Sequence, residues 1–161
     1  MEPERGQNPS EILVTQAGII GYVSIRGENS VKVLDLQAGA VVGEARVGPE
    51  PDTMQLTKDG RILVVALRGT PAYVALVDTN DNSGVRWTQL DGTTTGHQSL
   101  SADGAHTFVA VEGARAGIGV INNQTAEAVA MYSYPAASGA APPARPHGVL
   151  HDAERLTPSP R

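Results

Sequence analysis

The chain has 161 residues, which is enough for one ordinary domain with a hydrophobic core but not for two. Apolar residues make up 40% of it and aromatic residues only 4%, so Val, Ile, Leu and Ala must fill the interior, a composition that favours strands. The net charge of −5, with 12 Lys and Arg against 17 Asp and Glu, argues against a nucleic-acid partner, and the absence of cysteine excludes disulfides, thiolate catalysis and Cys-type zinc sites.

The N-terminus "MEPERGQNPSEILV" is polar and lacks the apolar stretch of a signal peptide. No apolar run approaches the length of a membrane span. We therefore expect no membrane span and, for the sequence as written, a cytoplasmic protein. A signal upstream in a longer gene would make it periplasmic or extracellular.

The first expected elements are four short strands between residues 8 and 47. The first two lie in "NPSEILVTQAGIIGYVSI" (8–25) and are joined by a turn at Gly18. The third is "NSVKVLDL" (29–36) and the fourth is "AVVGEARV" (40–47). Each run is β-rich and too short for a helix, which predicts a four-stranded unit.

The same order of elements returns twice, at offsets of 42 to 44 residues. In "MQLTKDGRILVV" (54–65) and "SLSADGAHTFVA" (99–110), an Asp-Gly pair separates two alternating apolar runs. This is the strongest local signal for a hairpin, because Gly supplies the positive φ that a tight turn requires. We therefore assign structural turns to Gly18, Asp59, Gly60, Asp103 and Gly104. The later strands of these units are "PAYVALVDT" (71–79), "GVRWTQL" (84–90), "AGIGVINN" (116–123) and "AEAVAMYSY" (126–134).

A fourth unit begins at "RPHGVLHDAE" (145–154), after an Ala/Pro-rich insertion. Four antiparallel strands every 42 to 50 residues is the period of a β-propeller blade, whereas a β-sandwich has no reason to repeat in register. The predicted fold is all-β, with about three blades and the first strand of a fourth in one partial domain, residues 1–161. The expected blades are 6–48, 49–92 and 93–144, followed by a stub at 145–155 and a disordered tail at 156–161.

The motifs that carry a family resemblance are "GYVSIRGENSVKVLDLQAGAVVGEARVG" (21–48) and "PDTMQLTKDG" (51–60). They resemble the YVTN-type β-propeller repeat family, which is related to surface-layer propellers and to the seven-bladed quinoprotein-like and lactonase-like propellers. The chain departs from the family pattern at Ser24 and Ile25, where Thr-Asn is usual, and at Asn122, where Asp is usual. The fourth unit also stops after its first strand.

Three blades cannot close a ring, because propellers normally have four to eight. The chain is therefore expected to be either a fragment of a longer propeller or a half-ring that closes as a homodimer. We favour the fragment.

Four polar residues occupy equivalent positions where the first strands of successive units begin: Glu11, Thr53, His97 and His147. First strands line the channel of a propeller, so these side chains are expected to converge. A carboxylate with imidazoles, including the nearby His151, could bind a metal or act as acid and base. The alternative is that they are ordinary polar residues lining a wet channel. The resemblance implies that a channel histidine, His97 or His147, can be catalytic.

Two classes of function follow from these expectations. The first, which we favour, is a non-enzymatic scaffold that holds a protein or a small ligand on one propeller face. The alternative, implied by the resemblance, is an enzyme at the channel mouth: a lactonase, a lyase or a quinoprotein-like oxidoreductase. No cofactor is expected from the sequence.

Overall fold

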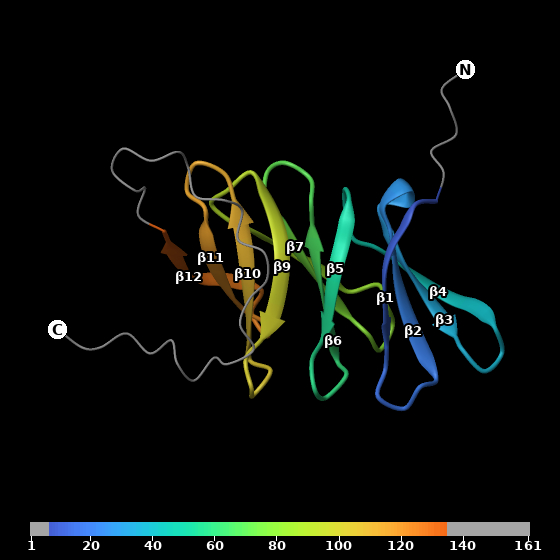
Figure 1. Ribbon diagram of the computed structural model, residues 1–161. Helices are drawn as coiled ribbons and strands as arrows, with labels where there is room; N and C mark the ends of the chain where they lie inside the picture. Colours follow the sequence, from blue (N-terminus) through green and yellow to red (C-terminus); the bar gives the residue numbers. More distant parts are fainter. Residues whose placement is uncertain (1–6, 135–161) are drawn as a thin grey trace, which may run out of the picture.

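The computed structural model describes residues 7–134, which form three four-stranded antiparallel sheets (Figure 1). Within each sheet the strands are ordered as they occur in the chain, in the sheets β1-β2-β3-β4, β5-β6-β7-β8 and β9-β10-β11-β12. Their bounds are β1 Pro9–Val14, β2 Ile20–Ile25, β3 Ser30–Asp35, β4 Ala40–Arg46, β5 Pro51–Leu56, β6 Ile62–Leu67, β7 Tyr73–Asp78, β8 Val85–Gln89, β9 Thr94–Leu100, β10 His106–Glu112, β11 Gly117–Asn122 and β12 Glu127–Ser133. The predicted all-β fold with three blades is confirmed.

The described residues contain one short helical element, the 3₁₀ turn η1 at Arg26–Glu28, which the sequence patterns did not indicate. It lies between β2 and β3 and ends at Asn29, whose φ of 57° is in the left-handed region. Within residues 7–134, no helix is long and apolar enough to cross a membrane.

The hairpins between the first two strands of each blade have the same local construction in blades 2 and 3. Gly60 and Gly104 have φ values of +72° and +73° at the turn. Before each glycine, a hydroxyl donates to the Asp carboxylate of the turn, from Thr57 to Asp59 at 2.6 Å and from Ser101 to Asp103 at 2.5 Å. These bonds satisfy polar groups within the loop, so the turn conformation is set locally by its own residues.

The three blades stand side by side, and their first strands β1, β5 and β9 are neighbours (Figure 1). Two apolar clusters hold the blades together. The cluster between blades 1 and 2 includes Val31, Val33, Met54, Leu63 and Val65, and the cluster between blades 2 and 3 includes Val64, Val74, Leu76, Val109 and Ile121. Strand β6 serves both clusters because successive side chains of a strand point to opposite faces. The central blade is therefore buried on both faces.

Candidate functional site at the inner strands

Each of the inner strands β1, β5 and β9 contains a β-bulge at the same place in its repeat. The register with the second strand shifts between Pro9 and Ile12 in blade 1 and between Pro51 and Met54 in blade 2. In blade 3 it shifts between Thr95 and Gln98 of β9, which pair with Val111 and Val109 of β10. A bulge leaves backbone groups out of the ladder and redirects side chains, and bulges are common next to active sites. The residue pairs at the bulges are Ser10-Glu11, Asp52-Thr53 and Gly96-His97.

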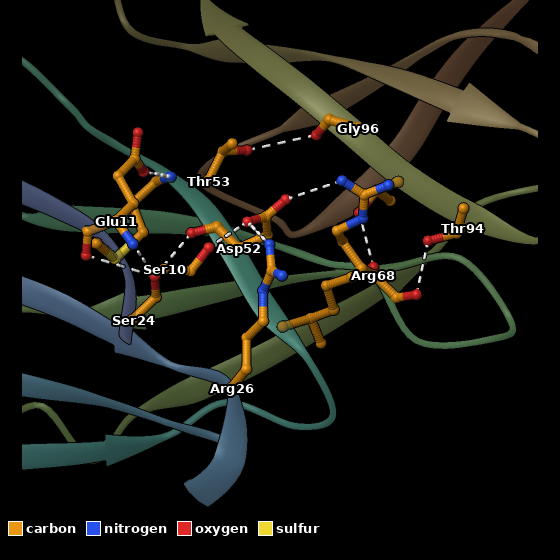
Figure 2. A network of polar contacts seen from close by, with 12 residues as sticks. Ser10, Glu11, Ser24, Arg26, Asp52, Thr53, Arg68, Thr94 and Gly96 are labelled. Carbon is orange, nitrogen blue, oxygen red and sulfur yellow. Dashed lines mark hydrogen bonds and ion pairs between the residues drawn. The ribbon is translucent and has the colours of Figure 1, made fainter. Parts of the chain in front are cut away.

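Asp52 is the centre of a charged network that joins blades 1 and 2 (Figure 2). Its Oδ1 accepts a hydrogen bond from the hydroxyl of Ser10 at 2.5 Å and forms an ion pair with the guanidinium of Arg26. Its Oδ2 lies 3.4 Å from Nη1 of Arg68. The Asp52 side chain is 12% exposed, against 30% for Arg26 and 38% for Arg68. A nearly buried carboxylate is thus held between two partly exposed cations.

The charge of Asp52 is stabilised by these partners. Burial raises the pKa of this carboxyl, but the hydrogen bonds from Ser10 and Arg26 and the positive charges of Arg26 and Arg68 lower it by more. The net result is a pKa below the usual 3.8. Asp52 is therefore ionised at neutral pH.

The Glu11 side chain also makes a contact from blade 1 to blade 2, but its pKa is shifted in the opposite direction to that of Asp52. Its carboxylate accepts a hydrogen bond from the backbone N–H of Met54, the first residue of β5 that is back in register with β6 after the bulge. Burial raises the pKa of Glu11, the Met54 bond lowers it, the charge of Asp52 raises it and that of His97 lowers it, with a net increase above 4.5. Glu11 and His97 are therefore within electrostatic range of each other although 86 residues separate them in the sequence.

The junction between blades 2 and 3 is closed by hydrogen bonds to backbone carbonyls. The Thr53 hydroxyl donates to the carbonyl of Gly96 at 3.4 Å, and Nε2 of Gln98 donates to the carbonyls of Thr53 and Val64 at 2.9 Å each. Gln98 is only 6% exposed, and its Oε1 is buried without a hydrogen-bond partner in the described part of the chain. The bulges are thus bonded by side chains of adjacent blades.

The structure brings together three of the residues that the sequence placed at the channel. Glu11, Thr53 and His97 lie on the adjacent strands β1, β5 and β9, and we call them the inner row. His147 and His151 lie outside the described residues. No group of three or more His, Cys, Asp or Glu that could hold a metal ion occurs in residues 7–134. A metal role for Glu11, His97, His147 and His151 stays a prediction.

Sequence reasoning missed the charged network beside the inner row. Asp52 precedes Thr53, and Arg26 and Arg68 each follow the second strand of a blade. The offset of 42 residues between the two arginines is a signal that could have found them. It equals the offset between the first two repeats, so both arginines lie at equivalent places.

A scan against protein-family models matches residues 2–112 to the family described as "Lactonase, 7-bladed beta-propeller". The chain belongs to the lactonase family of seven-bladed β-propellers. This confirms the sequence-based resemblance to that group. The match to this propeller family includes all of the inner row and the Asp52 network. No curated protein sequence matches the chain.

Two solved structures show the same fold at low sequence identity. A structure titled "Dihydro-heme d1 dehydrogenase NirN in complex with DHE" is 16% identical with a TM-score of 0.66, and the match covers 80% of this propeller chain and 28% of that chain. The Cps50 (Swd1) β-propeller domain of Myceliophteria thermophila is 15% identical with a TM-score of 0.63, and the match covers 79% and 41%. The hydrazine synthase of Kuenenia stuttgartiensis is 16% identical with a TM-score of 0.47, and the match covers 84% and 52%. The chain spans about half or less of the length of each of these proteins.

Proposed function

We propose that the chain is a binding module in which the inner row contacts a small polar ligand at the channel of a propeller and does not catalyse a reaction of that ligand. The observation that carries this proposal is the repeated bulge. It places a carboxyl group, a hydroxyl and an imidazole from Glu11, Thr53 and His97 on neighbouring strands. Convergent polar groups on a rigid scaffold are the usual construction of a small-molecule site.

Binding without catalysis is favoured because polar groups of the inner row already have hydrogen-bond partners within the protein. The Glu11 carboxylate is already engaged by the backbone of Met54, and the Thr53 hydroxyl by the carbonyl of Gly96. The negative charge of Asp52 is balanced by its ion pairs with Arg26 and Arg68. Groups held in this way orient a ligand by their remaining lone pairs and protons, whereas a general base needs its acceptor free toward the reacting proton.

A second candidate function is lactone hydrolysis. The family match favours it, because that match covers residues 2–112 and so includes Glu11 and His97. In this alternative, His97 would take a proton from the water whose oxygen attacks the lactone carbonyl carbon. The acyl–oxygen bond of the ring would break, and Glu11, whose pKa is raised by burial, would give a proton to the leaving ring oxygen.

One experiment on the 161-residue chain separates the two functions. The probes are δ-gluconolactone and its hydrolysis product gluconate, with binding followed by NMR chemical shifts and hydrolysis followed by proton release. Binding that weakens in His97→Ala and Thr53→Val, with no hydrolysis above the buffer rate, supports the module. His106→Ala is the matched control, since His106 begins β10 away from the inner row.

The alternative outcomes are equally definite. Hydrolysis above the buffer rate that is lost in His97→Ala would replace the module by the enzyme. Shifts that are the same in the wild type, His97→Ala and Thr53→Val would remove the inner row as the site.

A further inference from the structure

The chain has one tryptophan, Trp87, and it lies at the outer edge of the molecule rather than in the core. It is on β8, the last strand of blade 2, and is 53% exposed. Its position is fixed, because the indole Nε1 donates a 2.7 Å hydrogen bond to the carbonyl of Val47 in blade 1. The indole nitrogen also lies close to Gly48, which has a φ of +110°, since a Cβ added at Gly48 would be 3.6 Å from it. A large aromatic surface is therefore held rigidly in contact with solvent.

The equivalent position in blade 3 shows that packing between blades does not require this exposure. By strand register, Trp87 pairs with Ala75 and Met131 pairs with Gly119, 44 residues later in each case. Met131 packs against the apolar cluster between blades 2 and 3 and is only partly exposed. An unbranched side chain is thus sufficient to fill this position. The exposed half of Trp87 is left over from the packing.

Trp87 forms one wall of a groove of about 420 Å³ between the outer parts of blades 1 and 2, which we call the Trp87 groove. The groove combines the aromatic surface with hydrogen-bonding groups of several kinds. Its lining residues are Glu44, Arg46, Asn82, Ser83, Val85 and Trp87.

The charges around the Trp87 groove balance. Glu44 is paired with Lys32 at 2.9 Å and lies 3.8 Å from Arg46, and Lys32 also pairs with Glu28 at 2.7 Å. Two cations and two anions leave no net charge to attract an ion. The hydrogen bond from Lys32 lowers the pKa of Glu44, so this balance holds at neutral pH.

Asn82 supplies a further hydrogen-bonding group that is not used inside the protein. It lies in the loop between β7 and β8 with φ of 57°, and its Oδ1 is buried without a hydrogen-bond partner among residues 7–134. A Cβ added at Gly43, on strand β4 of blade 1, would lie 3.6 Å from the side-chain nitrogen of Asn82. An unpaired buried carbonyl oxygen is costly, and a turn of the Asn82 side chain that brings this oxygen into the groove, where a ligand hydroxyl can donate to it, would reduce that cost.

We propose that the Trp87 groove binds a pyranose sugar, free or as part of a glycan. A pyranose has an apolar C–H face that stacks on an aromatic ring and a rim of neutral hydroxyls that both donate and accept. These features match a rigid exposed indole whose own N–H is already engaged, together with the uncharged balance of the groove. An isolated cation would also stack on the ring, but Arg46 already places a positive charge beside the groove.

The test uses the intrinsic fluorescence of Trp87, which reports on this groove alone because no other tryptophan is present. The 161-residue chain is titrated with methyl glucoside, methyl galactoside, methyl mannoside and their common disaccharides. We expect a saturable change in emission for at least one of them. In Asn82→Ala the fluorophore is retained and the affinity should fall about tenfold, as for loss of one hydrogen bond to a buried group.

Further variants and probes keep the outcome definite. Trp87→Ala, followed by NMR, should lose binding by about tenfold or more, and Trp87→Phe should retain part of it. Arg115→Ala is the control, because Arg115 is an exposed arginine of blade 3, paired with Asp91 outside the groove. No saturable response to any sugar overturns the proposal, as does equal affinity in wild type and Asn82→Ala. A response to tetramethylammonium but to no sugar would assign the groove to a cation instead.

Discussion

The carboxylate of Asp52 should contribute measurably to the stability of the contact between blades 1 and 2. Its Oδ1 accepts a hydrogen bond from Ser10 and pairs with Arg26, and its Oδ2 lies 3.4 Å from Nη1 of Arg68. The substitution Asp52→Asn keeps the size of the side chain and one acceptor oxygen but removes the charge. Two guanidinium groups would then lose their counterion beside an apolar junction.

The size of the effect follows from burial. A hydrogen bond to a charged group contributes about 1.5–3 kcal/mol when it is well buried, and an exposed ion pair contributes at most about 1 kcal/mol. Asp52 is 12% exposed, but its arginine partners are 30% and 38% exposed, so solvent screens them in part. We therefore expect Asp52→Asn to lower the free energy of unfolding by about 1–2 kcal/mol at pH 7.

Urea unfolding measures this directly. With a slope near 1.5 kcal/mol per M, a loss of about 1.5 kcal/mol moves the midpoint down by about 1 M. Asp91→Asn is the control, since Asp91 and Arg115 form an ion pair in which the side chains are 62% and 73% exposed. Its midpoint should move by less than a third as much. A shift for Asp52→Asn no larger than the control would refute the reasoning.

The pH dependence supplies a second check on Asp52. Its folded-state pKa lies below the usual 3.8, so its contribution to stability is fully present above that value and is lost as the pH falls through the folded-state pKa. The difference between wild type and Asp52→Asn should therefore be constant near neutrality and become smaller as the pH falls below 3.8 toward the folded-state pKa. A difference that stays undiminished as the pH falls below 3.8 would mean that ionisation is not its source.

Three other substitutions have defined outcomes. In Gly60→Ala the added Cβ meets nothing within 4 Å, so the expected loss of about 1 kcal/mol in unfolding free energy comes from the positive φ alone and should be seen in urea melts. For Glu11→Gln, thermal melts across pH should lose a decline in stability that the wild type shows as pH rises from 4.5 through the raised folded-state pKa. Gln98→Met leaves the carbonyls of Thr53 and Val64 without their donor, so chemical unfolding should show a loss of about 1–3 kcal/mol despite the greater apolarity of Met.

The blades could be predicted from the sequence because their determinants are local and repeated. The residues that end each third strand show this clearly. Asp35 and Asn122 each accept hydrogen bonds from backbone N–H groups two and three residues ahead, and Asp78 accepts from the N–H of Asn80. Since an Asx turn is made within four residues, its signal survives in a linear reading.

The site could be predicted only in part, because its contacts cross between blades. Period alone brought Glu11, Thr53 and His97 to neighbouring strands. The pairing of Asp52 with Arg26 could not be read in that way, since it depends on which side chain a bulge redirects toward the adjacent blade. Bulges have no sequence signature as strong as an Asp-Gly turn, and here none of the bulge pairs is repeated.

That lack of repetition is itself informative about function. The glycine at the first hairpin is the same in all three blades, with φ of 69°, 72° and 73°, whereas the bulge pairs are Ser10-Glu11, Asp52-Thr53 and Gly96-His97. If these pairs only had to satisfy the backbone of a bulge, one solution would serve three times. Each blade instead presents a different chemical group at the same place. If the proposed function is right, this variety is what contact of one asymmetric small molecule with several blades at once would require.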